Sequence, residues 1–191
     1  MLDKLPKLAP QDHVIKLLLP IIPLKLKPNH LTFLRLVFTP VLIVLLVVNE
    51  FVIGLILFVI LALTDMFDGS LARLRNQITD WGKIWDPIAD KLLIGSIVSI
   101  LLLEINLSLA ILLFTFEAAF ILGGTFAKLK YKDIDIQANV WGKIKMNFHV
   151  FGAGLLIVGF FLGSINVITL AEILFYISLL FAATSLITKG I

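Results

Sequence analysis

The feature that most constrains the fold of this chain is a series of long apolar runs separated by short polar segments. We place six of them near residues 31–49, 52–74, 84–103, 107–127, 144–163 and 166–187. Each is close to the roughly 20 residues that a helix needs to cross the hydrocarbon core of a bilayer. The mean hydropathy of +1.06 and the hydrophobic share of 60% exceed those of soluble domains, in which about half of the residues are apolar. The sequence therefore predicts an all-α membrane protein with six transmembrane helices.

The segment before the first run predicts a different element. Residues 1–13 are polar, and residues 14–25 are apolar but interrupted by prolines, with Lys16, Lys25 and Lys27 in or beside them. This segment is too short to span a bilayer, and its composition favours an amphipathic helix that lies in the membrane interface. We therefore divide the chain into an N-terminal polar and interfacial segment, 1–30, and a six-helix transmembrane domain, 31–191.

The basic residues gather in alternate connections between the runs. All 16 Lys and Arg residues lie in the N-terminal segment, the 75–83 and 128–145 segments, the helix ends beside them, or at Lys189. The loops near 49–51, 104–106 and 163–166 hold none. Cytoplasmic loops carry an excess of Lys and Arg, so we expect an integral membrane protein, in the inner or plasma membrane if the organism is a prokaryote. We expect both termini, the 75–83 segment and the active site beside it to face the cytoplasm. We expect no nucleic-acid partner.

Four aspartates lie in one polar stretch, residues 65–90, which joins the second run to the third. Asp65 and Asp68 are three residues apart and Asp86 and Asp90 are four apart, so each pair shares one face of a helix. Carboxylates at membrane depth are costly and indicate a functional site. No cation partner is evident nearby, and oxygen ligands without His or Cys favour Mg²⁺, Mn²⁺ or Ca²⁺. Two such pairs could hold two metal ions for phosphoryl transfer, and a carboxylate beyond the needs of the metals could act as general base.

The residues around these aspartates suit a phosphate ligand. Gly69, Ala72 and Gly82 would let a diphosphate approach the backbone closely, and Arg73 could contact phosphate oxygens. Helix capping and loop solvation are the alternative roles for aspartates here, and we assign Asp80 to an N-cap. A membrane prenyltransferase and a small cation transporter are alternative functions. A single compact aspartate stretch argues against the first, and the small residues at helix-turn offsets argue against the second.

The whole pattern from Asp65 to Asp90, Asp-x2-Asp-Gly-x2-Ala-Arg-x8-Gly-x3-Asp-x3-Asp, resembles the signature of the CDP-alcohol phosphotransferase family. The resemblance implies an enzyme that transfers a substituted phosphate from a CDP-linked donor to an alcohol and releases CMP. It also implies six transmembrane helices, an N-terminal interfacial helix and a homodimer. Carried over by position, it implies that Asp90 is the catalytic base. It further implies that the metal ligands are Asp65, Asp68, Asp86 and Asp90, and that the CDP pocket is lined by Gly69, Ala72, Arg73 and Gly82.

Two shorter stretches resemble the phosphatidylglycerophosphate synthases of this family. One is Pro-Asn-His-Leu-Thr-x2-Arg, residues 28–35, followed by Pro40, and the other is Asp-Pro-Ile-Ala-Asp-Lys, residues 86–91. The resemblance implies that Asn29 and Thr32 help to hold the nucleotide of the donor, although Asn29 could equally be an N-cap. It predicts CDP-diacylglycerol as donor and sn-glycerol 3-phosphate as acceptor, giving phosphatidylglycerophosphate. Inositol phosphate, phosphatidylglycerol and serine are the alternative acceptors.

The elements that would bind the acceptor match the synthases less completely than the aspartate stretch does. Residues 142–149 resemble the Gly-Lys-x-Lys element of these synthases, so Lys143, Lys145 and His149 are candidates for binding the acceptor phosphate. The two lysines could instead be interface anchors, and the histidine an ordinary interior residue. The synthases also carry an Arg-Glu pair and a second arginine in the fourth span. This chain has Phe116 before Glu117, and Gly124 in place of the second arginine.

Overall fold

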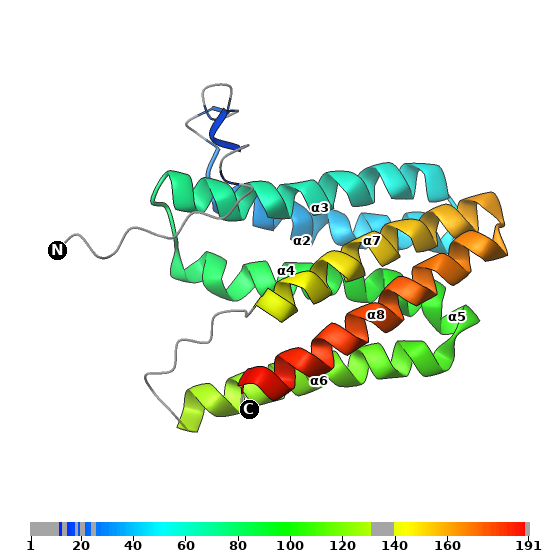
Figure 1. Cartoon of the computed structure of the whole chain (residues 1–191). Coiled ribbons are helices and arrows are strands. Elements are labelled where there is room, and N and C mark those ends of the chain that lie inside the picture. Colours follow the sequence, from blue (N-terminus) through cyan, green and yellow to red (C-terminus); the bar gives the residue numbers. More distant parts are fainter. Residues whose placement is uncertain are drawn as a thin grey trace.

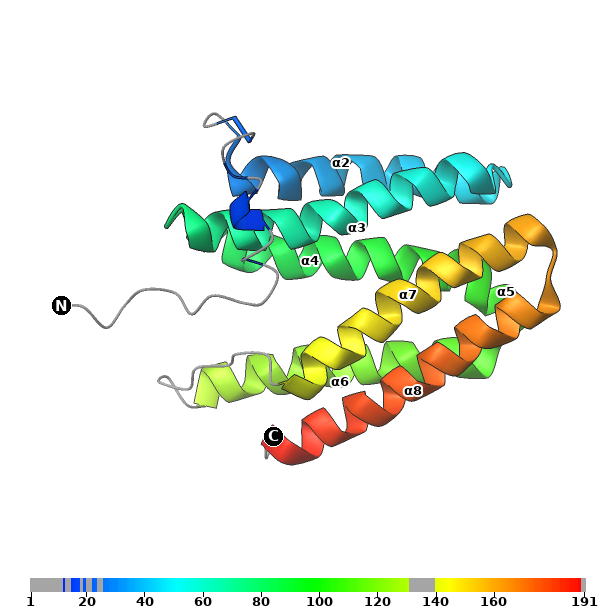
Figure 2. The same ribbon diagram turned by 45° about the horizontal axis from the view of Figure 1, so that its top comes forward.

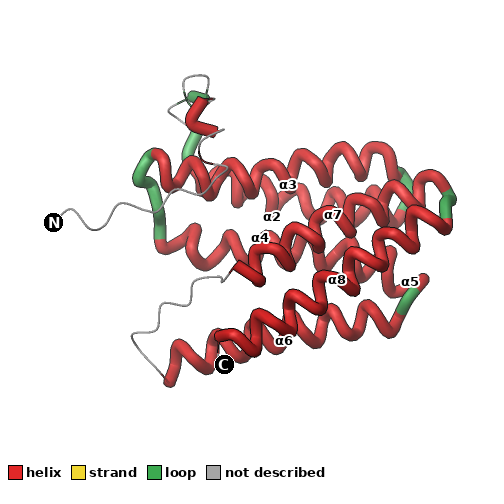
Figure 3. Tube along the Cα trace, viewed as in Figure 1, coloured by secondary structure: helices red, strands yellow, loops and turns green. Residues whose placement is uncertain are grey.

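The computed structural model of the chain describes residues 26–130 and 140–189, together with residues 12, 15–17, 19, 22 and 23 of the N-terminal segment. Within these residues every regular element is helical (Figure 3), and each of the predicted apolar runs forms a helix. The elements are α2 (Pro28–Val47), α3 (Phe51–Leu74), α4 (Asp80–Ile97), η1 (Val98–Leu102), α5 (Leu103–Ile105), α6 (Leu107–Lys130), α7 (Val140–Leu162) and α8 (Ile165–Lys189). The predicted all-α fold is confirmed.

Four of these helices are long and apolar enough to cross a membrane by length and composition. They are α2, α3, α7 and the Ile165–Ser185 part of α8, whereas α6 contributes a shorter apolar helix, Leu107–Leu122. The third predicted run is α4 continued by the π-helical turn η1 and by α5. The count of six spans therefore stays a prediction. The predicted interfacial helix at 14–25 falls largely outside the described residues and also stays a prediction.

The helices run lengthwise and pack side by side, as Figures 1 and 2 show. α2, α3 and α4 form one group, and α7 packs against α3, α4 and α8, while α6 packs against α8. One apolar core connects all of them and includes Leu42, Phe58, Ile97, Leu156 and Phe175. The core fixes the relative positions of α2, α3 and α4, which carry the predicted site.

The connections between helices alternate between two ends of the molecule. The described N-terminal residues, the α3–α4 connection and the C-terminal end of α8 lie at one end, on the left in Figures 1 and 2. The α2–α3 and α7–α8 turns lie at the other end. Asn49 and Gly163 adopt left-handed backbone conformations in these two turns, with φ of 61° and 58°. The end with the α3–α4 connection is the one to which the polar stretch of the sequence belongs.

Candidate active site

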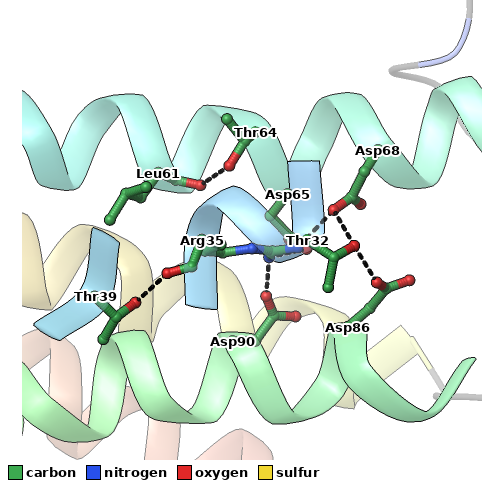
Figure 4. A network of polar contacts seen from close by, with 9 residues as sticks. All are labelled: Thr32, Arg35, Thr39, Leu61, Thr64, Asp65, Asp68, Asp86 and Asp90. Carbon is green, nitrogen blue, oxygen red and sulfur yellow. Dashed lines mark hydrogen bonds and ion pairs between the residues drawn. The ribbon is translucent and has the colours of Figure 1, made fainter. Parts of the chain in front are cut away.

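The four aspartates of the polar stretch face one another across two helices. Asp65 and Asp68 come from α3, and Asp86 and Asp90 from α4, while α2 packs against both of these helices. Figure 4 shows the four carboxyl groups pointing toward side chains of α2 that lie between them. The structure therefore brings the two aspartate pairs together at one site. Their role in metal binding stays a prediction.

A buried arginine of α2 occupies the centre of this cluster. Arg35 is fully buried; its Nη1 donates to Asp65 Oδ1 at 2.5 Å and also to Asp90, and its Nη2 donates to Asp68 Oδ2 at 2.6 Å. The metal prediction rested partly on the expectation that these aspartates have no cation partner, and that expectation is wrong. The reason is tertiary, because Arg35 lies 30 residues before Asp65 and reaches it only through helix packing. The position of Arg35 inside an apolar run could have indicated a charged partner, because ionisable side chains within membrane-spanning segments usually pair with one another.

Thr32 supplies the fourth aspartate with a partner. It lies one helical turn before Arg35, and its hydroxyl contacts Asp86 Oδ1 at 2.5 Å and Asp68 Oδ2 at 3.3 Å. Residues three apart share a helix face, so α2 presents Thr32 and Arg35 to all four carboxyl groups. The structure thus places Thr32 against the aspartates themselves, whereas its predicted contact with the nucleotide is not tested.

The cluster has the chemistry for a divalent cation, although it is not a closed coordination set. Among the described residues, no three acidic or histidine side chains are arranged as a ready-made metal site. The carboxyl groups of Asp65 and Asp90 nevertheless meet around one nitrogen of Arg35. A single guanidinium cannot neutralise four carboxylates. Oxygen donors converging from two helices are the ligands that Mg²⁺ and Mn²⁺ take, so the residues fit such an ion.

The predicted CDP side of the site is crowded around Gly82. A Cβ atom at this buried glycine would lie 3.2 Å from Thr79 Oγ1, 3.3 Å from Asp86 Oδ2 and 3.5 Å from Asn29 Oδ1. The Thr79 hydroxyl accepts the Gly82 N–H at 3.0 Å and donates to Asn29 at 2.9 Å. Thr79 is therefore the N-cap of α4, and the assignment of Asp80 to this position is wrong by one residue. Asn29 is inside α2 rather than its N-cap.

Arg73 lies over Gly69 and already binds a carboxylate. Its Nη1 is 3.4 Å from the Cβ position of Gly69, and its Nε and Nη2 both bond to Asp12 at 2.8 Å. Asp12 is fully buried. A forked pair of this kind is the geometry in which arginine also binds phosphate. The N-terminal segment therefore reaches the predicted CDP pocket, a contact that the sequence did not indicate.

A second polar cluster lies between α6 and α7. Lys145 is buried and pairs with Glu117, its ammonium lies 4.4 Å from the centre of the Phe120 ring, and His149 Nδ1 is 3.8 Å from Glu117 Oε1. Two of the three predicted acceptor residues, Lys145 and His149, are thus brought together with Glu117. Lys143 is exposed and does not join them. The side chain position of residue 124, where the synthases carry their second arginine, lies outside the described part.

The two clusters are neighbours. Lys91, next to Asp90 on α4, lies within electrostatic range of Asp90, Glu117 and Lys145. The charged groups therefore extend from the four-aspartate cluster on α3 and α4 toward the Glu117–Lys145 pair on α6 and α7. Such an arrangement can hold one anionic substrate at the aspartates through cations and a second one beside Asp90.

Comparison with known proteins identifies the family. The family model for CDP-alcohol phosphatidyltransferase matches residues 25–184, and the chain belongs to this family. A CDP-diacylglycerol–glycerol-3-phosphate 3-phosphatidyltransferase of Rickettsia typhi is 35% identical over 135 residues, which cover 69% of this chain and 76% of that protein. A protein of the same name from Mycoplasma pneumoniae is 31% identical over 98 residues, covering 51% of this chain and 43% of its own.

A third relative carries a different name. A probable cardiolipin synthase (CMP-forming) of Drosophila melanogaster is 40% identical over 72 residues, 37% of this chain and 22% of that protein. The family match and these relatives confirm the predicted family and its enzymatic class, that of the transferases of phospholipid biosynthesis. They also agree with the apolar helices of an integral membrane protein.

Proposed function

We propose that this protein transfers the phosphatidyl group of CDP-diacylglycerol to sn-glycerol 3-phosphate, giving phosphatidylglycerophosphate and CMP. The observation that carries the proposal is the convergence of four aspartates from α3 and α4 in the signature spacing, together with the buried Lys145 that pairs with Glu117. The names of the bacterial relatives support this acceptor. The name of the insect relative makes phosphatidylglycerol the alternative acceptor to be tested.

The aspartates would hold the metal ions of the reaction. We assign Asp65, Asp68, Asp86 and Asp90 to Mg²⁺ or Mn²⁺, with two ions expected from the two carboxylate pairs. When bound, the ions would neutralise the diphosphate and the charge that develops on the CMP leaving group. Gly82, Asn29 and Arg73 would form the nucleotide side of the site. Gly82 would provide the space, and the Arg73 fork would exchange the Asp12 carboxylate for an anionic group of the donor.

Asp90 would start the transfer. Its carboxylate accepts the proton of the acceptor hydroxyl, whose oxygen then attacks the phosphorus that bears the diacylglycerol. The bond between that phosphorus and the bridging oxygen breaks, and CMP leaves with both electrons. The Asp90 carboxylate is partly exposed, and its sequence neighbour Lys91 lies within electrostatic range of the Glu117–Lys145 pair. Lys145 would bind the phosphate of the acceptor there, because a buried ammonium is a strong donor to phosphate oxygens.

The orientation and assembly are part of the same proposal. The polar stretch lies at the end of the molecule that also holds the described N-terminal residues, to which Arg75 is bonded through the Leu26 carbonyl. The excess of basic residues at this end supports a cytoplasmic active site. The homodimer remains an inference from the family resemblance.

The test is a direct assay of CMP release. The purified protein would receive CDP-diacylglycerol and Mg²⁺ or Mn²⁺, with separate reactions containing glycerol 3-phosphate, glycerol, inositol phosphate, serine or phosphatidylglycerol. We expect CMP release with glycerol 3-phosphate and formation of phosphatidylglycerophosphate. Faster turnover with phosphatidylglycerol would transfer the assignment to cardiolipin synthesis. No CMP release with any acceptor, together with cation transport in liposomes, would refute the enzymatic proposal.

A further inference from the structure

Arg35 holds the centre of the four-aspartate cluster, where the proposed metal ions would have to bind. We propose that Arg35 is an internal counter-ion that competes with the divalent cations for the same carboxylate oxygens, and thereby lowers the metal affinity of the site while keeping its metal-free form assembled. The inference rests on the proposed metal site and assigns a function to a residue outside the aspartate signature.

The contacts of Arg35 carry the first step. Its two terminal nitrogens bond to Asp65, Asp68 and Asp90, which come from both α3 and α4. These carboxylates have no other ion-pair partner in the described part of the chain. Without a cation between them, Asp65 and Asp90, whose side chains are 45% and 22% exposed, would face each other as like charges, which is costly. Arg35 therefore holds α2, α3 and α4 together at this point.

The geometry also makes Arg35 a competitor. Nη1 sits on Asp65 Oδ1 at 2.5 Å and Nη2 on Asp68 Oδ2 at 2.6 Å, distances at which an oxygen cannot also coordinate an ion from the same side. Two like charges held within a few ångströms repel strongly in a site of low polarity. A divalent ion that binds these oxygens from the same side must therefore displace the guanidinium, and one that binds beside it is held less tightly. Thr32, in contrast, is a neutral partner of Asp86 and Asp68 and brings no such repulsion.

A buried donor without a partner supports the displacement. The side chain of Arg35 is fully buried, and its Nε atom has no hydrogen-bond partner among the described residues. An unsatisfied buried donor costs free energy, so the attraction of the carboxylates must hold the guanidinium in this position. Once metal ions neutralise the carboxylates, that attraction falls while the cost of the unsatisfied Nε remains. The guanidinium is thus poised to leave the position it occupies here.

The experiment compares metal binding and thermal stability in detergent for the whole protein and for Arg35→Met. Mn²⁺ binding is followed by electron paramagnetic resonance, and the melting temperature is measured with EDTA and with saturating Mn²⁺. We expect Arg35→Met to melt at a lower temperature in EDTA and to bind Mn²⁺ at least about tenfold more tightly, because a positive charge has been removed from the site. A purely structural role would not tighten metal binding.

Arg75→Met is the matched control. Arg75 is an arginine at the end of α3 whose bonds go to the main-chain carbonyl groups of Ile22, Pro23 and Leu26, and not to the aspartates. Its removal should leave the Mn²⁺ affinity unchanged. If wild type binds Mn²⁺ and Arg35→Met binds it equally or more weakly, the counter-ion inference is refuted and the metal site stands. If wild type binds no Mn²⁺, both are refuted.

A measurement on the wild-type protein does not depend on how Arg35→Met folds. The chain has only three arginines, so the Nε–H signals of ¹⁵N-arginine-labelled protein can be assigned by substituting Arg73 and Arg75 in turn. We expect saturating Mg²⁺ to shift the Arg35 signal and to leave the Arg75 signal in place. An Arg35 signal that does not respond to Mg²⁺ at a concentration supporting full activity would overturn the inference.

Discussion

The replacement of Lys145 by methionine tests the acceptor site most directly. Lys145 is 7% exposed, pairs with Glu117 and lies over the Phe120 ring, whereas Lys143, two residues earlier on the same helix, is exposed. Both lysines belong to the same sequence element, and only the structure distinguishes them. Methionine keeps most of the apolar length of the lysine and removes its charge, so the packing against Phe120 is largely retained.

The expected magnitude follows from this difference in burial. A hydrogen bond to a charged group contributes about 1.5–3 kcal/mol, and each 1.4 kcal/mol corresponds to about a factor of ten. Lys145→Met should therefore lower kcat/KM for glycerol 3-phosphate by about ten- to a hundredfold. An exposed charge contributes about 0–1 kcal/mol, so Lys143→Met should lower it less than about fivefold.

The assay is CMP release at varied acceptor and donor concentrations. If Lys145 binds the acceptor phosphate, the loss appears in kcat/KM for glycerol 3-phosphate, while the KM for CDP-diacylglycerol stays within about twofold. Glycerol, which has no phosphate, should be used equally poorly by wild type and variant. The reasoning is refuted if Lys143→Met is the more damaging change, or if Lys145→Met loses activity equally with both acceptors.

The remaining predictions concern the base, the metals and the helix packing. Asp90→Asn should lose about 10²–10⁴-fold in turnover, as expected for removal of a general base, while CDP-diacylglycerol still binds; normal turnover would rule out the base assignment. EDTA should abolish CMP release and Mg²⁺ or Mn²⁺ should restore it, and activity that persists after exhaustive chelation would contradict the proposed metal site. Gly159→Ala should lower the free energy of unfolding by about 1–3 kcal/mol through overpacking, because its Cβ would lie 2.7 Å from Ile168 Cγ1 and 3.1 Å from the Ile168 backbone nitrogen. Gly95→Ala, which has no neighbour within 4 Å, is the control, and equal melting temperatures for the two variants would refute the packing argument.

Much of the fold could be predicted from the sequence, because long apolar runs leave few options. Each run forms a helix, since a backbone in lipid has to satisfy its hydrogen bonds internally, and the alternation of basic segments matches the alternation of connections between the two ends. The exact helix ends were less predictable. Asp80 and Thr79 are both good N-caps, and only the contact of Thr79 with Asn29 and Gly82 decides between them.

The composition of the site was determined by the sequence alone. The spacing of Asp65, Asp68, Asp86 and Asp90 was enough to place each pair of carboxylates on one face of its helix, because helical periodicity is a local property. The same spacing, with the small residues beside it, was enough to indicate the family that the comparisons confirm.

The arrangement of charges around those carboxylates was decided only by the tertiary structure. Arg35 is 30 residues from Asp65 and 55 from Asp90, and Glu117 is 28 from Lys145. Such pairs depend on which helices pack together and at what rotation, and no local pattern encodes that choice. For the same reason the sequence could not separate Lys143 from Lys145. One of them faces the bundle and the other faces outward, because residues two apart on a helix do not share a face.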